Sequence, residues 1–218
     1  MAKMETAPLH SDPPTASART ADAVSEAVGW VQKAKGGNRH ACNHLVAQFQ
    51  ENIYRMVFYR IRSRPDAEDL TQDIFMQAFK HLPRLKNDAR FKSWLFSIAL
   101  NRVRDYYRKK KLRSFFMTST DNKNNAGRTP EPEDQHTTGA LQHVIRKDFW
   151  HQVGILLDKM PRMEKEVFTL RFMDQLSIRE ISQALKKNES TVKTHLYRGL
   201  QKFRKETSMH DFLQEVIS

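Results

Sequence analysis

Residues 160–205 read MPRMEKEVFTLRFMDQLSIREISQALKKNESTVKTHLYRGLQKFRK. The second half of this stretch carries apolar residues at helical spacing on both sides of a polar segment at 186–188. They are Leu176, Ile178, Ile181, Ala184 and Leu185 before the segment, and Val192, Leu196, Leu200 and Phe203 after it. Asn188 favours a helix start because its side chain accepts hydrogen bonds from free backbone N–H groups. Two helices joined by a tight polar turn predict a helix-turn-helix.

The second predicted helix also has a polar and basic face. Its members are Ser190, Thr191, Lys193, Thr194, Tyr197 and Arg198. Hydroxyls and a lysine near the start of a helix reach DNA phosphates, and longer side chains one turn further on reach base edges. The face therefore predicts binding in a DNA major groove. The alternative is a helical hairpin whose basic face is merely solvated.

Composition limits both the fold and the class of partner. The chain has 218 residues, of which 39% are hydrophobic, with only 7 Gly and 8 Pro. We find no alternating β-branched runs bounded by turn dipeptides, so we expect an all-α fold of two small helical domains joined by a flexible linker. The formal net charge of +12 favours a polyanionic partner, nucleic acid before membrane, because the cations cluster at particular helices.

The single cysteine, Cys42, excludes an internal disulfide and offers no cysteine-pair metal motif, which fits a reducing cytosol. Cys42 and His44 are expected to pack or to face water rather than to bind a ligand. The chain contains no apolar run long enough to span a bilayer and no apolar signal core at its N-terminus. We therefore expect a cytoplasmic protein without cofactor, metal or membrane insertion.

The composition divides the chain into five segments. Residues 1–25 are small, polar and proline-containing, and predict a disordered leader. Residues 26–113 are expected to form the first helical domain, and residues 141–206 the helix-turn-helix domain. Between them, residues 114–140 are rich in Asn, Thr, Gly and Pro and predict a linker. The tail, residues 207–218, carries apolar residues at helical spacing and is a candidate short helix.

Three apolar stripes at helical spacing predict the core of the first domain. They are Leu45, Val46, Phe49, Ile53, Met56, Val57 and Ile61, then Leu70, Ile74, Phe75, Ala78, Phe79 and Leu82, then Trp94, Leu95, Ile98, Ala99 and Tyr106. Pro65 and the acids that follow it favour the start of the second helix. Arg102 falls on the apolar side of the third helix, so we expect it to snorkel to solvent or to pair with Asp105.

The second and third of these helices also display polar surfaces. The second helix exposes a row of acids and amides to solvent or to a protein partner: Asp69, Gln72, Asp73 and Gln77. Asp69 and Asp73 would also suit a divalent metal in a nucleic-acid enzyme, but no histidine or third acid is spaced to complete the ligand set. The third helix carries Asn101, Arg104 and Arg108 on one edge and ends in cations beside Tyr106 and Tyr107. Such a surface suits single-stranded nucleic acid, because cations neutralise phosphates while bases stack on rings.

The order of three runs resembles that of an extracytoplasmic-function (ECF) sigma factor of bacterial RNA polymerase, a member of the sigma-70 family. The runs are DAEDLTQDIFMQAF at 66–79, FKSWLFSIALNRVRDYYRKKK at 91–111, and the stretch at 160–205. The resemblance covers about residues 28–206. It implies that the first two runs belong to conserved region 2 and the last to region 4, with no globular region 3 between them.

The resemblance implies core RNA polymerase and promoter DNA as partners, leaves an anti-sigma factor open as a third, and implies no catalysis by this chain. It implies a polymerase face, formed by Asp69, Gln72, Asp73 and Gln77, that docks on the clamp helices of the largest polymerase subunit. It implies a -10 set that handles an extruded base and nearby phosphates: Lys86, Asn87, Arg90, Lys92, Asn101, Arg104, Arg108 and Lys109. It implies a -35 face that reads the -35 element: Ser190, Thr191, Lys193, Thr194, His195, Tyr197 and Arg198.

Two positions depart from the pattern of that family. Lys186 stands in the hairpin turn where the family often has glycine, so the left-handed backbone position is predicted to be shifted or absent. His195 stands where the family often has arginine. The string TVKTHL at 191–196 is equally typical of LuxR-like regulators, which bind operator DNA without polymerase. Such a regulator would carry a module with strands, and residues 28–112 predict none.

Overall fold

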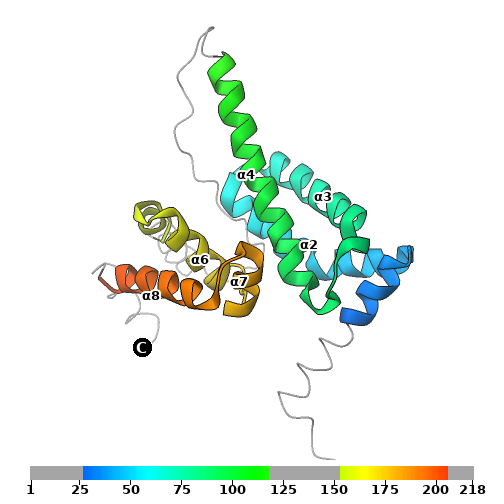
Figure 1. The fold of residues 1–218 in the computed structure, drawn as a ribbon. Helices are drawn as coiled ribbons and strands as arrows, with labels where there is room; N and C mark the ends of the chain where they lie inside the picture. The colour runs from blue at the N-terminus through cyan, green and yellow to red at the C-terminus, as the bar shows by residue number, and fades with distance from the viewer. Residues whose placement is uncertain (1–26, 118–152, 206–218) are drawn as a thin grey trace, which may run out of the picture.

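The computed structural model describes residues 27–117 and 153–205. Within these residues every regular element is helical and no strand is present, which confirms the predicted all-α fold. The predicted leader at 1–25, the linker beyond residue 117 and the tail at 207–218 lie outside the described residues. Figure 1 shows the helices of the two described ranges as two neighbouring groups, which we call the first and second domains.

The first domain starts with helical residues 27–35, followed by α2 (Arg39–Ile61) and α3 (Arg64–His81). The side chain of Asn38 caps α2 by accepting a hydrogen bond from the Ala41 backbone N–H, and α2 ends at Arg62 in a left-handed conformation. Pro65 lies in the first turn of α3, where its missing N–H costs no hydrogen bond. Each helix therefore begins at a residue whose chemistry favours a helix start.

Two short 3-10 turns, η1 (Leu82–Arg84) and η2 (Asp88–Arg90), lead from α3 into α4 (Phe91–Met117). The long helix predicted from Phe91 is confirmed. It continues past Arg113, where the sequence predicts the end of the first domain, and ends at Met117. Figure 1 shows the second half of α4 extending away from both domains.

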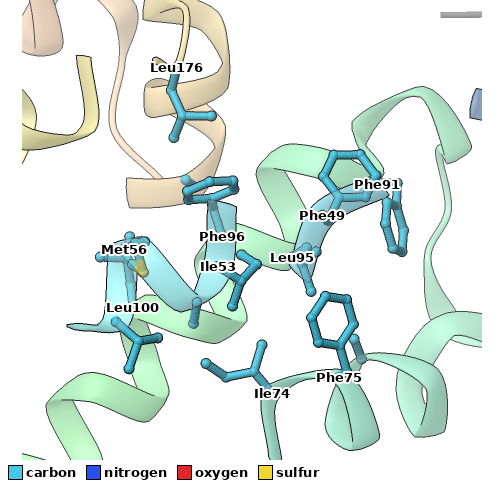
Figure 2. Close-up of a cluster of buried hydrophobic side chains, with 14 of the residues drawn as sticks. Phe49, Ile53, Met56, Ile74, Phe75, Phe91, Leu95, Phe96, Leu100 and Leu176 are labelled. Carbon is cyan, nitrogen blue, oxygen red and sulfur yellow. The ribbon is translucent and has the colours of Figure 1, made fainter. Parts of the chain in front are cut away.

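The three predicted stripes meet in one core, as Figure 2 shows for residues of α2, α3 and α4. Ile53, Ile74 and Leu95 are fully buried there. The core also contains residues outside the predicted stripes: Ala67, Phe91, Phe96, Leu100 and Val103. Most of these are on α4, because α4 is covered both by α2 and α3 and by a helix of the second domain.

The second domain comprises helical residues 153–159, α6 (Arg162–Phe172), α7 (Ile178–Leu185) and α8 (Glu189–Lys205). A reciprocal capping box starts α7: the Ser177 hydroxyl accepts from the Glu180 backbone N–H at 3.2 Å, and the Glu180 carboxylate accepts from the Ser177 backbone N–H at 2.7 Å. α7 and α8 form the predicted helix-turn-helix.

The prediction for the turn between α7 and α8 is wrong. Lys186 itself adopts the left-handed conformation, with φ 53° and ψ 47°, so the position that the family often fills with glycine is neither shifted nor absent. The backbone N–H of Lys187 donates to the Ser182 carbonyl at 3.0 Å, and the Ser182 hydroxyl donates to the Lys187 carbonyl at 2.6 Å. These bonds close the end of α7 and hold an exposed lysine in a conformation that costs L-residues free energy.

The two domains pack directly against each other through α7 and the first half of α4. Leu176, fully buried at the start of the helix-turn-helix, lies beside Phe96 in Figure 2. Residues of both domains belong to one continuous apolar cluster. The sequence predicts two domains and a linker but contains no signal for this contact.

Candidate polymerase and nucleic-acid interfaces

The polymerase face lies on α3 and is only partly free. Asp69 and Gln72 are exposed, whereas Asp73 and Gln77 are half-buried. Beside them Met76 exposes 64% of its surface, an unusual exposure for a large apolar side chain. Met76 is not among the residues predicted from the sequence, although its position off the buried stripe of α3 is a usable signal. The face thus combines polar groups with one apolar side chain, a composition typical of protein interfaces.

The environment of Asp73 corrects the prediction for Arg102. Arg102 pairs with Asp73 of α3, with 3.2 Å between Nε and Oδ2, instead of snorkelling or pairing with Asp105. Asp105 pairs with Arg108 at 3.0 Å. Helix-wheel reasoning considered only α4, but α3 packs alongside and supplies the carboxylate. Asp73 therefore also links α3 to α4.

The first members of the -10 set lie on a short loop between two buried residues. Leu85 and Phe91 are both buried, and between them Lys86, Asn87 and Arg90 are exposed. The Asn87 side chain accepts from the Ala89 backbone N–H at 3.0 Å and so caps η2. The loop presents an amide and two cations to solvent from a defined backbone.

The other members of the -10 set lie on α4. Asn101, Arg104, Arg108 and Lys109 are all exposed, and the Arg104 guanidinium donates to the side-chain amide oxygen Oδ1 of Asn101 at 3.3 Å, so these residues lie along one edge of α4. On the neighbouring side, Tyr106 donates to Asp66 at 2.8 Å. Burial, together with this carboxylate, raises the pKa of Tyr106 to about 12. Tyr106 is therefore part of the domain's packing. The Tyr107 hydroxyl donates to the Arg60 backbone carbonyl, but Tyr107 is 45% exposed.

The -35 face follows α8. Ser190, Lys193, Thr194, Tyr197 and Arg198 are exposed, as predicted, and Tyr197 has an exposed fraction of 61%. Thr191 and His195 are half-buried. The Nδ1 atom of His195 is buried without a hydrogen-bond partner, so this ring is directed partly into the domain. The outward face therefore consists of the five exposed residues Ser190, Lys193, Thr194, Tyr197 and Arg198. Thr191 and His195 lie at its border.

Polar contacts across the domain boundary cover one end of the -10 set. Lys92 pairs with Glu180 of α7 at 3.1 Å, and the Ser93 hydroxyl bonds to the Gln183 amide oxygen at 2.6 Å. Burial opposes the charged form of Glu180, but the Ser177 backbone N–H and Lys92 lower its pKa below the ordinary value. Glu180 thus both caps α7 and neutralises a predicted DNA-contacting lysine.

A second set of contacts joins α2 to the helix-turn-helix domain. Arg60 lies 3.0 Å from both the Glu166 and the Asp174 carboxylates. Asp174 has only 1% of its side chain exposed. Burial lowers the pKa of Arg60, but the two carboxylates outweigh that effect and raise it overall. Burial raises the pKa of Asp174, and the charge of Arg60 only partly offsets this. We call these three residues the Arg60 clasp.

The described residues show neither a group of side chains that could bind a metal ion nor a helix that could cross a membrane. Across residues 27–117 and 153–205, no three His, Cys, Asp or Glu side chains gather closely enough to hold a metal ion. In that part of the chain no helix has the length and apolar character needed to cross a membrane. Cys42 is a half-buried free thiol, and the ring of its neighbour His44 stacks on Trp30 at 4.2 Å. Both residues therefore pack, as the sequence predicts.

Comparison with known proteins finds two family models that match separate parts of the chain. Residues 45–113 match the family model of Sigma-70 region 2, and residues 152–203 match that of Sigma-70, region 4. The chain is 29% identical over 174 residues to the ECF RNA polymerase sigma factor BldN of Streptomyces coelicolor, with 78% of this chain and 61% of BldN covered. It is 33% identical over 142 residues to a probable RNA polymerase sigma factor of Haemophilus influenzae, with 61% of this chain and 72% of that protein covered.

A solved structure shares the fold. CnrH, in its complex with the cytosolic domain of CnrY, is similar with a TM-score of 0.58 and 22% sequence identity. The similarity covers 81% of this chain and 93% of CnrH. At that identity the likeness concerns the arrangement of the helices.

Proposed function

Because the chain belongs to the extracytoplasmic-function group of the sigma-70 family, we propose that it binds core RNA polymerase and directs promoter-specific transcription initiation through -10 and -35 elements. The polymerase carries out the catalysis, and this subunit supplies the choice of promoter. Its partners are core polymerase and promoter DNA. The observation that carries the proposal is the presence of two separate polar surfaces, one in the region 2 match and one in the region 4 match.

The -35 face suits double-stranded DNA. A single helix fits the major groove, and α8 presents hydroxyls and cations from its first three turns. Lys193 and Arg198 neutralise phosphates, and Thr194 and Tyr197 lie where side chains meet base edges. Because phosphate contacts release counterions, binding by this face depends steeply on salt.

The -10 set suits melted DNA. Asn101 offers both a donor and an acceptor to a base edge, and Arg104 and Arg108 lie on the same edge of α4 where phosphates of a strand would pass. The exposed ring of Tyr107 provides a stacking surface at the basic end of this edge. These are groups that single-stranded nucleic acid requires and that a purely solvated helix does not need.

The polymerase face suits a protein partner. Asp69 and Gln72 are exposed beside Met76, so an apolar anchor is flanked by polar groups that can be matched by complementary charges. Reversal of an exposed charge costs little folding free energy but repels a complementary partner. This makes the face testable without loss of the fold.

The decisive experiment is run-off transcription from a genomic library, using core polymerase with and without the protein. New transcripts that require the protein are expected. Tight operator binding without polymerase would instead favour a LuxR-like regulator, and metal-dependent cleavage by the protein alone would favour a nucleic-acid enzyme.

The polymerase face is tested by charge reversal and pull-down with core polymerase. Asp69→Lys is expected to abolish the association with the melting temperature unchanged. Asp73→Lys is expected to abolish it and also to lower the melting temperature, because Asp73 pairs with Arg102 at 3.2 Å. Glu68→Lys, an equal change at an exposed neighbouring position of α3, is the control. Undiminished binding of Asp69→Lys would mean that this face is only solvated.

A further inference from the structure

One lysine joins the N-terminal helical residues to the loop of the -10 set. Lys35 lies at the end of the helix over 27–35, and its ammonium donates to the Leu85 carbonyl oxygen at 2.5 Å and to the Asp88 carboxylate. The side chains of Lys35 and Asp88 are only 23% and 16% exposed. Lys35 precedes the residues that match the region 2 model, which begin at residue 45. Neither the resemblance nor the composition of the chain assigns it a role.

The position of Lys35 is set by the fold around it. Val31 and Ala34 of the same helix are buried in the core of the first domain. The chain then reverses through Gly37, whose φ of +83° a residue with a side chain adopts only with strain. The backbone N–H of Gly37 donates to the Ala34 carbonyl at 3.0 Å and closes the helix. Lys35 therefore reaches the loop from a rigid base.

Other hydrogen bonds of the loop join residues close in sequence: the Asn87 side chain accepts from the Ala89 backbone N–H at 3.0 Å, and the Ser93 hydroxyl donates to the Arg90 carbonyl at 3.0 Å. Its two ends are held by burial of Leu85 and Phe91. Between them stands the single 3-10 turn η2, whose hydrogen-bond geometry is poorer than that of an α-helix. Lys35 binds both the first residue of the loop and the first residue of η2, and these two contacts bracket Lys86 and Asn87.

We propose that Lys35 is a positioning residue for -10 recognition, holding residues 85–90 in the shape in which Asn87 and Arg90 meet the extruded base and its phosphate. This inference rests on the proposed function. The physical basis is preorganisation: groups that are already fixed in the bound geometry lose less entropy on binding and tolerate wrong bases less.

The Lys35–Asp88 ion pair lies within the first domain, whereas the Lys92–Glu180 ion pair on the other side of the loop joins the two domains. Lys92 pairs with Glu180 of the second domain, and this contact is lost whenever the domains separate. Lys35 and Asp88 both belong to the first domain. The loop therefore keeps the Lys35 contact when α7 leaves α4, and the loop reaches DNA already shaped.

The experiment compares Lys35→Met with the wild type on a promoter found by run-off transcription and on its single-base -10 variants. Open complexes formed with core polymerase are measured by permanganate footprinting. The preference of Lys35→Met for the cognate base is expected to fall roughly fivefold or more, the loss typical of one good base contact. Its affinities for core polymerase and for -35 duplex are expected to stay within about twofold of the wild type.

Two further variants make the result specific. Lys33→Met removes a lysine from the same helix that lies over the Trp30 ring instead of the loop, and it is expected to keep the wild-type preference. Asp88→Asn keeps the shape of the acceptor but removes its charge, and it is expected to lose preference as Lys35→Met does. The double variant Lys35→Met with Asp88→Asn should then lose little more than either alone.

The outcomes separate this inference from the function on which it rests. If the wild type opens no promoter, the proposed function fails. If the wild type opens promoters and both Lys35→Met and Asp88→Asn keep the full base preference, only the role of Lys35 is overturned. If Lys35→Met is poorly folded, the preference of Asp88→Asn decides the question.

Discussion

The two proposed DNA-binding surfaces differ in how far other parts of the protein cover them. The outward residues of the -35 face, among them Lys193 and Arg198, are exposed along α8. The -10 set is exposed along α4 and the loop, but at Lys92 it is covered by Glu180 of α7. One surface is ready to meet DNA as it stands, whereas the other is complete only after the second domain moves away.

The spacing of the promoter elements also indicates that the two domains separate on DNA. Elements at -10 and -35 lie about 25 base pairs apart, which is roughly 85 Å along B-DNA. In the structure, α7 of the second domain contacts α4 directly, with 3.1 Å between Lys92 Nζ and Glu180 Oε1. The segment 118–152 is long enough to span about 115 Å if fully extended. If the proposed function is correct, simultaneous binding to both elements is expected to break the contacts between the domains.

The largest expected effect comes from the Arg60 clasp. Arg60→Ala removes the ion-pair partner of the buried Asp174 carboxylate and leaves it only the weaker attraction of Arg55, and removal of one partner from a buried ion pair costs about 3–5 kcal/mol. Separation of the domains relieves this cost because Asp174 then meets water. We expect the closed arrangement to be lost, measured as an increased radius of gyration by small-angle X-ray scattering with the helical content retained.

The matched control for this change is Arg64→Ala. Arg64 pairs with Glu68 one turn away on an exposed surface, so its loss is expected to change stability by less than about 0.5 kcal/mol and to leave the dimensions unaltered. An Arg60→Ala protein as compact as the wild type would show that the apolar contact alone holds the domains together.

A smaller effect is expected on the -10 side of the comparison. Asn101→Ala removes an amide that can pair with a base edge, so promoter opening should lose about 1–3 kcal/mol of base discrimination while capture of -35 duplex is unchanged. Arg104→Ala should instead weaken opening equally for all -10 sequences. Permanganate footprinting on variant promoters separates the two. If Asn101→Ala melts every variant as the wild type does, Asn101 is structural.

On the -35 side the expected effect is electrostatic. Lys193→Ala and Arg198→Ala should each flatten the slope of log affinity against log salt by roughly one unit, because each removes one phosphate contact. The measurement is fluorescence anisotropy of -35 duplex across a salt series. Lys159→Ala, a cation at an exposed position before α6, serves as the control. Slopes that match the wild type would contradict the phosphate contacts.

The smallest expected effect is at the turn that supports the -35 face. Lys186→Gly should raise the free energy of unfolding by about 0.5–1 kcal/mol, because glycine adopts a φ of 53° without the steric cost that lysine meets. Urea unfolding measures it. Lys187→Gly, at a neighbouring residue whose φ is not positive, should lower stability instead. A loss of stability in Lys186→Gly would show that the lysine side chain contributes more than its backbone strain costs.

Much of the fold follows from patterns within single helices. The stripes containing Leu45, Ile74 and Ile181 lie in the core where periodicity predicts, because a helix that buries one face repeats apolar residues every three to four positions. Asn38, Pro65 and Ser177 stand at helix starts for local chemical reasons. The capping box at Ser177 has a sequence signal of its own, a Ser followed three residues later by Glu.

Pairings between helices did not follow from these patterns. Periodicity predicts that Arg102 snorkels to solvent or pairs with Asp105 on its own helix, whereas in the structure it pairs with Asp73 on α3. Lys35 and Asp88, and Arg60 and Asp174, are likewise joined only when segments distant in sequence fold together. Helix periodicity says which face a residue occupies, but not which neighbour covers that face.

The sequence by itself determined the all-α class, the helix-turn-helix, and the exposure of the outward residues of the -35 face and of the α4 edge. These depend on the spacing of apolar residues along one helix, which local geometry converts directly into a buried and an exposed side. Only the tertiary structure decided that α7 covers Lys92, that Lys35 holds the loop at 85–90, and that Lys186 takes the left-handed position. The first two depend on the free energy of contacts between distant segments, and the third depends on the free energy of closing a turn between packed helices. Such contacts produce no periodic pattern in the sequence.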